Sequence, residues 1–210
     1  MSRVRKKLWV VCGLSVLLVI GTTLAVWHQR IQHTNHLEAD TIKAQVVENF
    51  KPSEPKDTVT KDVSFKNEGT TDVFVRVAYV ENWEKKDKNN ETMLLSNQLS
   101  GKDVATKNWT DSFSADWQDG GDGWFYYKYV LPVGGSTAKI LNNVTFPDYM
   151  QEAYQNYGDA DYSLYFKVEM LQASTGDATL NKDTVNQEAS QTVFGKSADV
   201  DYKTNAVTWQ

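Results

Sequence analysis

Val73-Phe74-Val75-Arg76-Val77-Ala78-Tyr79-Val80 is the stretch of sequence that decides the fold. It consists mainly of β-branched and aromatic residues, which favour an extended, pleated backbone. Both faces of the expected strand are largely apolar, which is typical of a strand in the middle of a sandwich. Arg76 is the one charged residue in the stretch, and an unpaired buried charge is costly. We therefore expect Arg76 to pair with an acidic group or to reach the edge of the sandwich.

Four further segments have the residue pattern of strands, namely 59–66, 124–131, 136–146 and 161–171. Asn67-Glu68-Gly69-Thr70 is expected to form the turn of a hairpin that joins the first of them to the strand at 73–80. Pro132-Val133-Gly134-Gly135 ends the aromatic segment at 124–131. Strands at this spacing, broken by Gly, Pro and Asn, indicate an all-β domain, a jelly-roll-like antiparallel β-sandwich.

Three less regular segments predict short helical insertions. Residues 85–117 are polar, and they predict either a short helix or a long excursion between strands. Residues 147–154 follow the pattern of a helix start and predict a short helix beside the sheet. Residues 173–197 are expected to form a mobile insertion with one or two helical turns near 184–189.

The N-terminal residues have the pattern of an export signal. Four basic residues are followed by an apolar run over residues 8–27, which predicts an N-terminal signal helix. Thr23 and Ala25 are small residues at the positions that a signal peptidase reads, and cleavage after Ala25 would make Val26 the new N-terminus. A run of this length could also span the membrane uncleaved. The expected organisation is a signal peptide or anchor at 1–25, a leader at 26–43 and a β-sandwich domain at 44–210.

Composition narrows the possible functions. The only cysteine, Cys12, lies in the apolar run, so the exported part would contain no disulfide. Loss of Arg3, Arg5, Lys6 and Lys7 would leave 18 basic against 27 acidic residues, a net charge of −9. Because neutralising phosphates requires a basic face, this balance argues against nucleic acid as a partner.

Four segments together resemble one family. They are 21–42, 63–77 with its Asn67-Glu68-Gly69-Thr70 turn, 122–137 with Gly123-Trp124-Phe125-Tyr126-Tyr127, and 168–173. In this order they are similar to the biofilm matrix proteins exported through signal peptidase W, the BsaA/TasA/camelysin-like group. The chain departs from that pattern at Val26-Trp27-His28 and at Val133. The resemblance implies a jelly-roll sandwich, a Gram-positive extracellular or cell-surface location, and a role in matrix or fibres.

The resemblance also implies a mode of assembly. Fibre-forming relatives insert the N-terminus freed by signal cleavage into a neighbouring subunit, and an open sandwich has unpaired edges that can accept such a strand. Here the candidate donor strand lies in the leader, with Trp27, Ile31 and Leu37 as its apolar anchors. The alternative is a disordered leader. Expected partners are other copies of the chain, further matrix proteins, and the signal peptidase during export.

Two other functions are weighed against a structural role. Some members of the group are described as surface metallopeptidases, yet His28, His33 and His36 all lie in the leader, and no His-Glu-x-x-His helix is present. Asp119 and Asp122 lie in a glycine-rich run that could hold calcium, although such glycines more often serve a tight turn. We therefore expect no cofactor, no bound metal and no enzymatic activity.

Aromatic residues suggest carbohydrate binding as the other alternative. Trp109, Trp117, Trp124 and Tyr126 could form a stacking platform for a cell-wall sugar, although aromatics at alternating strand positions more often pack in a core. Trp83 is expected to be a packing residue. The favoured reading is a secreted structural subunit of an extracellular matrix or surface fibre.

Overall fold

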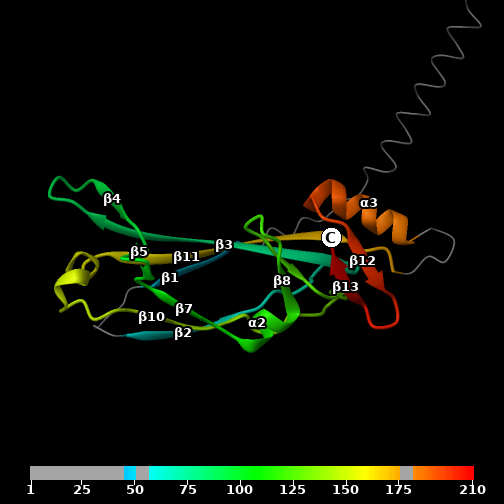
Figure 1. Cartoon of the computed structure of the whole chain (residues 1–210), viewed down its shortest axis with the longest axis horizontal. Helices are drawn as coiled ribbons and strands as arrows, with labels where there is room; N and C mark the ends of the chain where they lie inside the picture. Colours follow the sequence, from blue (N-terminus) through cyan, green and yellow to red (C-terminus); the bar gives the residue numbers. More distant parts are fainter. Residues whose placement is uncertain (1–44, 51–56, 176–181) are drawn as a thin grey trace, which may run out of the picture. The chain divides into compact units, whose positions relative to one another are not determined.

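The computed structural model describes residues 45–50, 57–175 and 182–210, and for residues 45–50 it describes the backbone alone. Thirteen strands, two α-helices and one 3₁₀ helix lie in these ranges (Figure 1). In chain order they are β1 Gln45–Phe50, β2 Thr58–Val63, β3 Val73–Lys86, β4 Thr92–Leu95, β5 Gln98–Leu99, β6 Lys102–Asp103, β7 Thr106–Trp109, α2 Asp111–Asp116, β8 Trp117–Asp119, β9 Phe125–Tyr127, β10 Leu141–Thr145, η1 Glu152–Tyr157, β11 Asp161–Gln172, α3 Lys182–Phe194, β12 Ala198–Asp201 and β13 Ala206–Trp209.

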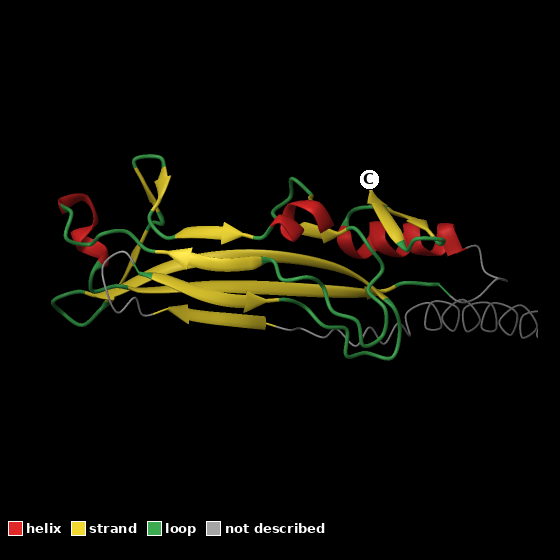
Figure 2. Cartoon of the chain, turned by 90° about the horizontal axis from the view of Figure 1, so that it is seen from below, coloured by secondary structure: helices red, strands yellow, loops and turns green. Residues whose placement is uncertain are grey.

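Two antiparallel sheets build the domain. The larger sheet has the order β1-β11-β3-β9-β8, with β4 also paired to β3, and the smaller sheet has the order β2-β10-β7. Two-stranded pairs, β5-β6 and β12-β13, lie outside them. The predicted all-β sandwich with short helical insertions is confirmed. Figure 2 shows the long strands at the centre of the domain, with the helices at their ends.

The two strongest strand predictions are confirmed, and they are neighbours. β3 and β11 pair along twelve residues, from Val73 opposite Gln172 to Glu84 opposite Asp161. β3 continues six residues beyond the predicted end at Val80. This long pair forms the centre of the larger sheet, as expected from the apolar residues on both of its faces.

The predicted hairpin between 59–66 and 73–80 is wrong. β2 pairs with β10 in the smaller sheet, whereas β3 pairs with β11, β9 and β4 in the larger one. The Asn67 turn therefore carries the chain from one sheet to the other. Asn67 is fully buried; its Nδ2 donates to the carbonyls of Thr71 and Leu131, and its Oδ1 accepts from the Gly69 N–H.

Other segments differ from their predictions in length and type. Only 125–127 of the aromatic segment and 141–145 of the next one form strands. The helix expected at 147–154 is a 3₁₀ helix that begins at Glu152. Residues 85–117 contain both a short helix, α2, and an excursion of short strands. α3 has 13 residues, more than the one or two turns expected, because its buried Asn186, Ser190 and Phe194 pack it onto the domain.

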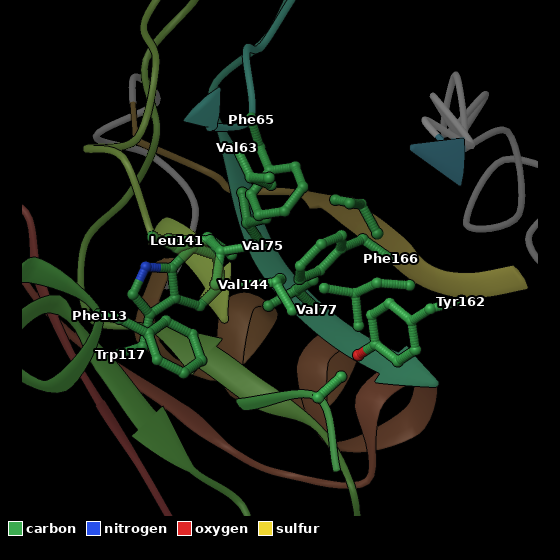
Figure 3. Close-up of a cluster of buried hydrophobic side chains, with 14 of the residues drawn as sticks. Val63, Phe65, Val75, Val77, Phe113, Trp117, Leu141, Val144, Tyr162 and Phe166 are labelled. Carbon is green, nitrogen blue, oxygen red and sulfur yellow. The ribbon is translucent and has the colours of Figure 1, made fainter. Parts of the chain in front are cut away.

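The main core fills the space between the two sheets (Figure 3). The larger sheet contributes Val75, Val77 and Phe166, and the smaller sheet contributes Val63 and Leu141, all of them 2% exposed or less. Along β3 and β11 the core residues alternate, so these strands place every second side chain in this core. In β10 a register shift between Leu141 and Asn143 separates the buried Leu141 and Val144 by three positions. The main core thus accounts for only one face of the larger sheet.

A second core lies on the opposite face of that sheet. Phe74 of β3, Leu171 of β11 and Tyr126 of β9 pack there against Phe194 of α3 and Trp209 of β13. We call α3 together with β12 and β13 the C-terminal cap. The cap lies over the end of the sheet at which β3 begins (Figure 1). It explains why Phe74 is apolar on a face where Val80, six residues later, is 65% exposed.

Candidate functional site

The N-terminal residues singled out by sequence all lie outside the described residues. They are the cleavage residues Thr23, Ala25 and Val26, the donor-strand anchors Trp27, Ile31 and Leu37, and the three leader histidines. Among the described helices, none is long and apolar enough to cross a membrane. The predictions of export, cleavage and strand donation therefore stay predictions, and the site must be sought on the sandwich that would receive a donor strand.

The outer edge of β11 is the candidate acceptor. β3 lines one side of β11 along residues 161–172, but β1 lines the other side only along residues 162–167. Residues 168–172 thus have no partner strand on that side within the described part of the chain. An edge of this kind presents free backbone groups that another strand can pair with.

The direction of these backbone groups follows from a neighbouring hydrogen bond. The Ala173 N–H donates to the Asp72 carbonyl at 2.8 Å, so the backbone groups of Ala173 point toward the side of β3. Because successive residues of a strand point to alternate sides, the N–H groups of Gln172, Met170 and Val168 point toward the open edge. Both Met170 and Val168 are buried in the main core, whereas Gln172 is half-buried.

β1 itself was missed by sequence reasoning. It pairs antiparallel with β11, with Gln45 opposite Lys167 and Phe50 opposite Tyr162. Val46-Val47 is the only β-branched signal in this short segment, too little to distinguish a strand from a loop. The pairing places Gln45, the first described residue of β1, opposite Lys167, next to residues 168–172 of β11.

Arg76 is paired, as expected. Its Nε and Nη2 donate to Glu169 Oε2 at 2.9 and 2.5 Å, and its Nη1 donates to the Phe194 carbonyl at 2.8 Å. The guanidinium lies 4.2 Å from the ring centre of Trp124 and 4.5 Å from that of Phe194. Burial alone would raise the pKa of Glu169, but hydrogen bonds from Lys167 and Arg76 outweigh it and hold that pKa below its usual value. Arg76 therefore fastens the C-terminal cap to the sheet.

The proposed aromatic platform does not form. Trp117 and Tyr126 are buried in different cores, at 4% and 0% exposure. Trp109 stacks on Phe113 at 4.7 Å, and one face of Trp124 is covered by Arg76. Trp109 and Trp124 are half-buried against the two cores, so the four side chains do not form one exposed platform for a sugar. Trp83 is fully buried, as predicted.

The glycine-rich loop at 119–123 uses its carboxylates internally. Asp119 accepts a hydrogen bond from the Gly121 N–H, and Asp122 accepts from the Trp124 N–H and from the Tyr126 hydroxyl. Gly121 and Gly123 have φ values of +70° and +86°, which favour glycine. The loop thus has the tight-turn role that its glycines suggested. No group of three or more His, Cys, Asp or Glu side chains able to hold a metal occurs among the described residues.

A polar cluster around Lys107 was not anticipated. The Lys107 side chain is only 5% exposed, and its Nζ lies 2.6 Å from Glu81 Oε2 and 3.0 Å from Asp103 Oδ2. Glu81 Oε2 also accepts hydrogen bonds from the Tyr162 hydroxyl and the Asn97 amide. Burial would lower the pKa of Lys107, but hydrogen bonding to the two carboxylates raises it. These residues are distant in sequence or lie in the polar excursion, so no local pattern indicates the cluster.

Comparison of the chain with known protein families, with curated proteins and with solved structures found no match in any of the three.

Proposed function

We propose that this chain is a secreted structural subunit of an extracellular matrix or surface fibre, and that subunits assemble by strand donation. The observation that carries the proposal is the stretch of the β11 edge at residues 168–172, which has no partner strand on its outer side among the described residues. It adjoins the start of β1, so a strand that continues β1 antiparallel to β11 would place residue 44 opposite 168 and residue 40 opposite 172. The same edge can accept the corresponding segment of a neighbouring copy.

The charge and burial of the domain suit this role. The two cores make the sandwich self-sufficient without a disulfide, as an extracellular subunit without cysteine requires. The open edge belongs to the longest strand pair in the sheet, so an added strand would extend an already rigid sheet. Backbone hydrogen bonds would supply the affinity, and alternate side chains of the donor would supply specificity.

The first test compares two chain lengths by negative-stain electron microscopy after concentration. One chain begins at Val26 and contains the candidate donor segment; the other begins at Ala44 and keeps β1. Filaments from the longer chain alone would support donation by residues 26–43. Filaments from both chains, or from neither, would contradict it.

The second test asks whether the edge of β11 at residues 168–172 receives the donor strand. Gln172→Pro removes one N–H that points to the open edge, while leaving the hydrogen bonds between β11 and β3 in place. Gln172→Ala keeps that N–H and serves as the matched control. We expect filaments from the alanine variant and none from the proline variant, with both monomers folded by circular dichroism. Filaments of equal length from the folded proline variant would rule out this edge as the acceptor.

A further inference from the structure

The polar cluster around Lys107 brings an amine and an amide onto one carboxylate oxygen. Glu81 Oε2 accepts from Lys107 Nζ at 2.6 Å and from Asn97 Nδ2 at 2.9 Å. Lys107 comes from β7, Glu81 from β3, and Asn97 from the turn before β5. A lysine amine and a side-chain amide that share one carboxylate oxygen, with little exposure to water, have the elements of an acyl transfer, because proximity removes much of its entropic barrier.

The carbonyl of Asn97 is polarised by fixed donors. Its Oδ1 accepts hydrogen bonds from the indole N–H of Trp83 at 2.9 Å and from the backbone N–H of Ala105 at 2.7 Å. Trp83 is fully buried and Asn97 is 8% exposed, so these donors act in a low-dielectric environment. Paired N–H donors on a carbonyl oxygen are the arrangement that stabilises the oxyanion formed when a nucleophile adds to the carbonyl carbon.

We propose that this cluster is a modification site at which Lys107 and Asn97 form an intramolecular isopeptide bond, with Glu81 carrying the protons. Glu81 takes a proton from the Lys107 ammonium group. The electron pair of the amine then forms the bond from Nζ to Asn97 Cγ, and the carbonyl pair moves to Oδ1. Glu81 returns a proton to Nδ2, the bond from Cγ to Nδ2 breaks, and ammonia leaves. The surplus proton on Nζ leaves through Glu81 with the ammonia as ammonium, so no oxidant or co-reactant is required.

Asp103 is the competing group in the cluster. Its carboxylate also contacts Lys107, and together with Glu81 it favours the ammonium form, so the reaction is expected to follow folding slowly. A bond to Asp103 would close a ring within four residues of the same chain segment. A bond to Asn97 instead closes residues 97–107, which include β5 and β6, into a covalent loop that ends on β7. The proposal is independent of fibre formation.

Intact-mass spectrometry of the purified chain tests the proposal directly, on fresh protein and again after prolonged storage. We expect a mass lower than that of the sequence by one ammonia molecule. Tryptic digestion should then leave residue 107 uncleaved, with the peptide 89–102 attached to the peptide 103–128. An unchanged mass after storage would overturn the proposal. Loss of one water molecule instead would overturn the role of Asn97, because water is released when Lys107 condenses with a carboxyl group, that of Asp103 or Glu81.

Matched variants distinguish the proposed isopeptide bond from the ion pairs that Lys107 makes with Glu81 and Asp103. Lys107→Arg keeps a cation beside Glu81 and Asp103 but cannot be acylated, and Glu81→Gln removes the proton carrier; both should keep the full calculated mass. Lys139→Arg replaces a lysine at a more exposed ion pair with Asp62 and should lose ammonia as the parent chain does. Loss of ammonia from Lys107→Arg would overturn the assignment.

Discussion

Replacing Arg76 with Met tests whether this one side chain fastens the C-terminal cap to the sheet. The Arg76 side chain is 11% exposed, and its removal breaks the pair with Glu169 and the hydrogen bond to the Phe194 carbonyl. Breaking a buried pair by removing one partner costs about 3–5 kcal/mol. Glu169 is 22% exposed and keeps Lys167 at 2.6 Å, which places the cost at the lower end.

The rings on either side of Arg76 change this figure little. Contacts with Trp124 and Phe194 contribute roughly 0.5–2 kcal/mol each when desolvated, and a Met side chain retains part of them by packing. We therefore expect Arg76→Met to lower the free energy of unfolding by about 3 kcal/mol.

Urea unfolding, followed by tryptophan fluorescence, measures this loss. A double-mutant cycle with Glu169→Gln should give a coupling energy of about 2 kcal/mol, because the two side chains share hydrogen bonds. Lys66→Met is the matched control, since its pair with Glu68 is exposed and should contribute less than about 0.5 kcal/mol. A loss of unfolding free energy below about 1 kcal/mol for Arg76→Met, or additive effects in the cycle, would refute the role of Arg76 in holding the C-terminal cap on the sheet.

Two further predictions concern stability. The pKa of Glu169 is held below its usual value of 4.5, so the stability gained from its pairing is present above pH 4.5 and is lost as the pH falls through the lowered pKa. The difference in unfolding free energy between the parent chain and Arg76→Met should therefore shrink over that range. A difference that stays constant in acid would contradict this prediction. Asn67→Ala leaves the Thr71 and Leu131 carbonyls without their buried donor. It should lower the free energy of unfolding by about 2–3 kcal/mol in the same urea assay. An effect below about 0.5 kcal/mol would show that water replaces the amide.

Local patterns predicted the strands with the strongest signals. The segments at 73–80 and 161–171 are rich in apolar and aromatic residues, and both are central strands. The pairing of Arg76 was also predictable, since a charge within an apolar strand requires a partner wherever that strand is buried. In contrast, β1 has too few β-formers to stand out, and its strand depends on the edge of β11 that it pairs with.

Contacts between segments that are distant in sequence could not be predicted from local patterns. The Asn67 turn has residues typical of a hairpin turn, yet it joins two sheets, because Asn67 donates a hydrogen bond to the Leu131 carbonyl 64 positions away. The candidate acceptor edge also depends on pairing between distant segments, since among the described residues β1 lines β11 only along residues 162–167. Likewise, the Lys107 cluster gathers Glu81, Asn97 and Tyr162 from separate strands and turns.

The sequence by itself determined the class of the fold, its central strands and the need to neutralise Arg76, because alternation and residue type act within a few residues along the chain. Only the tertiary structure decided which strands share a sheet, that the C-terminal cap builds a second core, and which part of the β11 edge has no partner strand among the described residues. Those features depend on contacts between segments far apart in sequence, whose free energy is gained only when both segments are buried together.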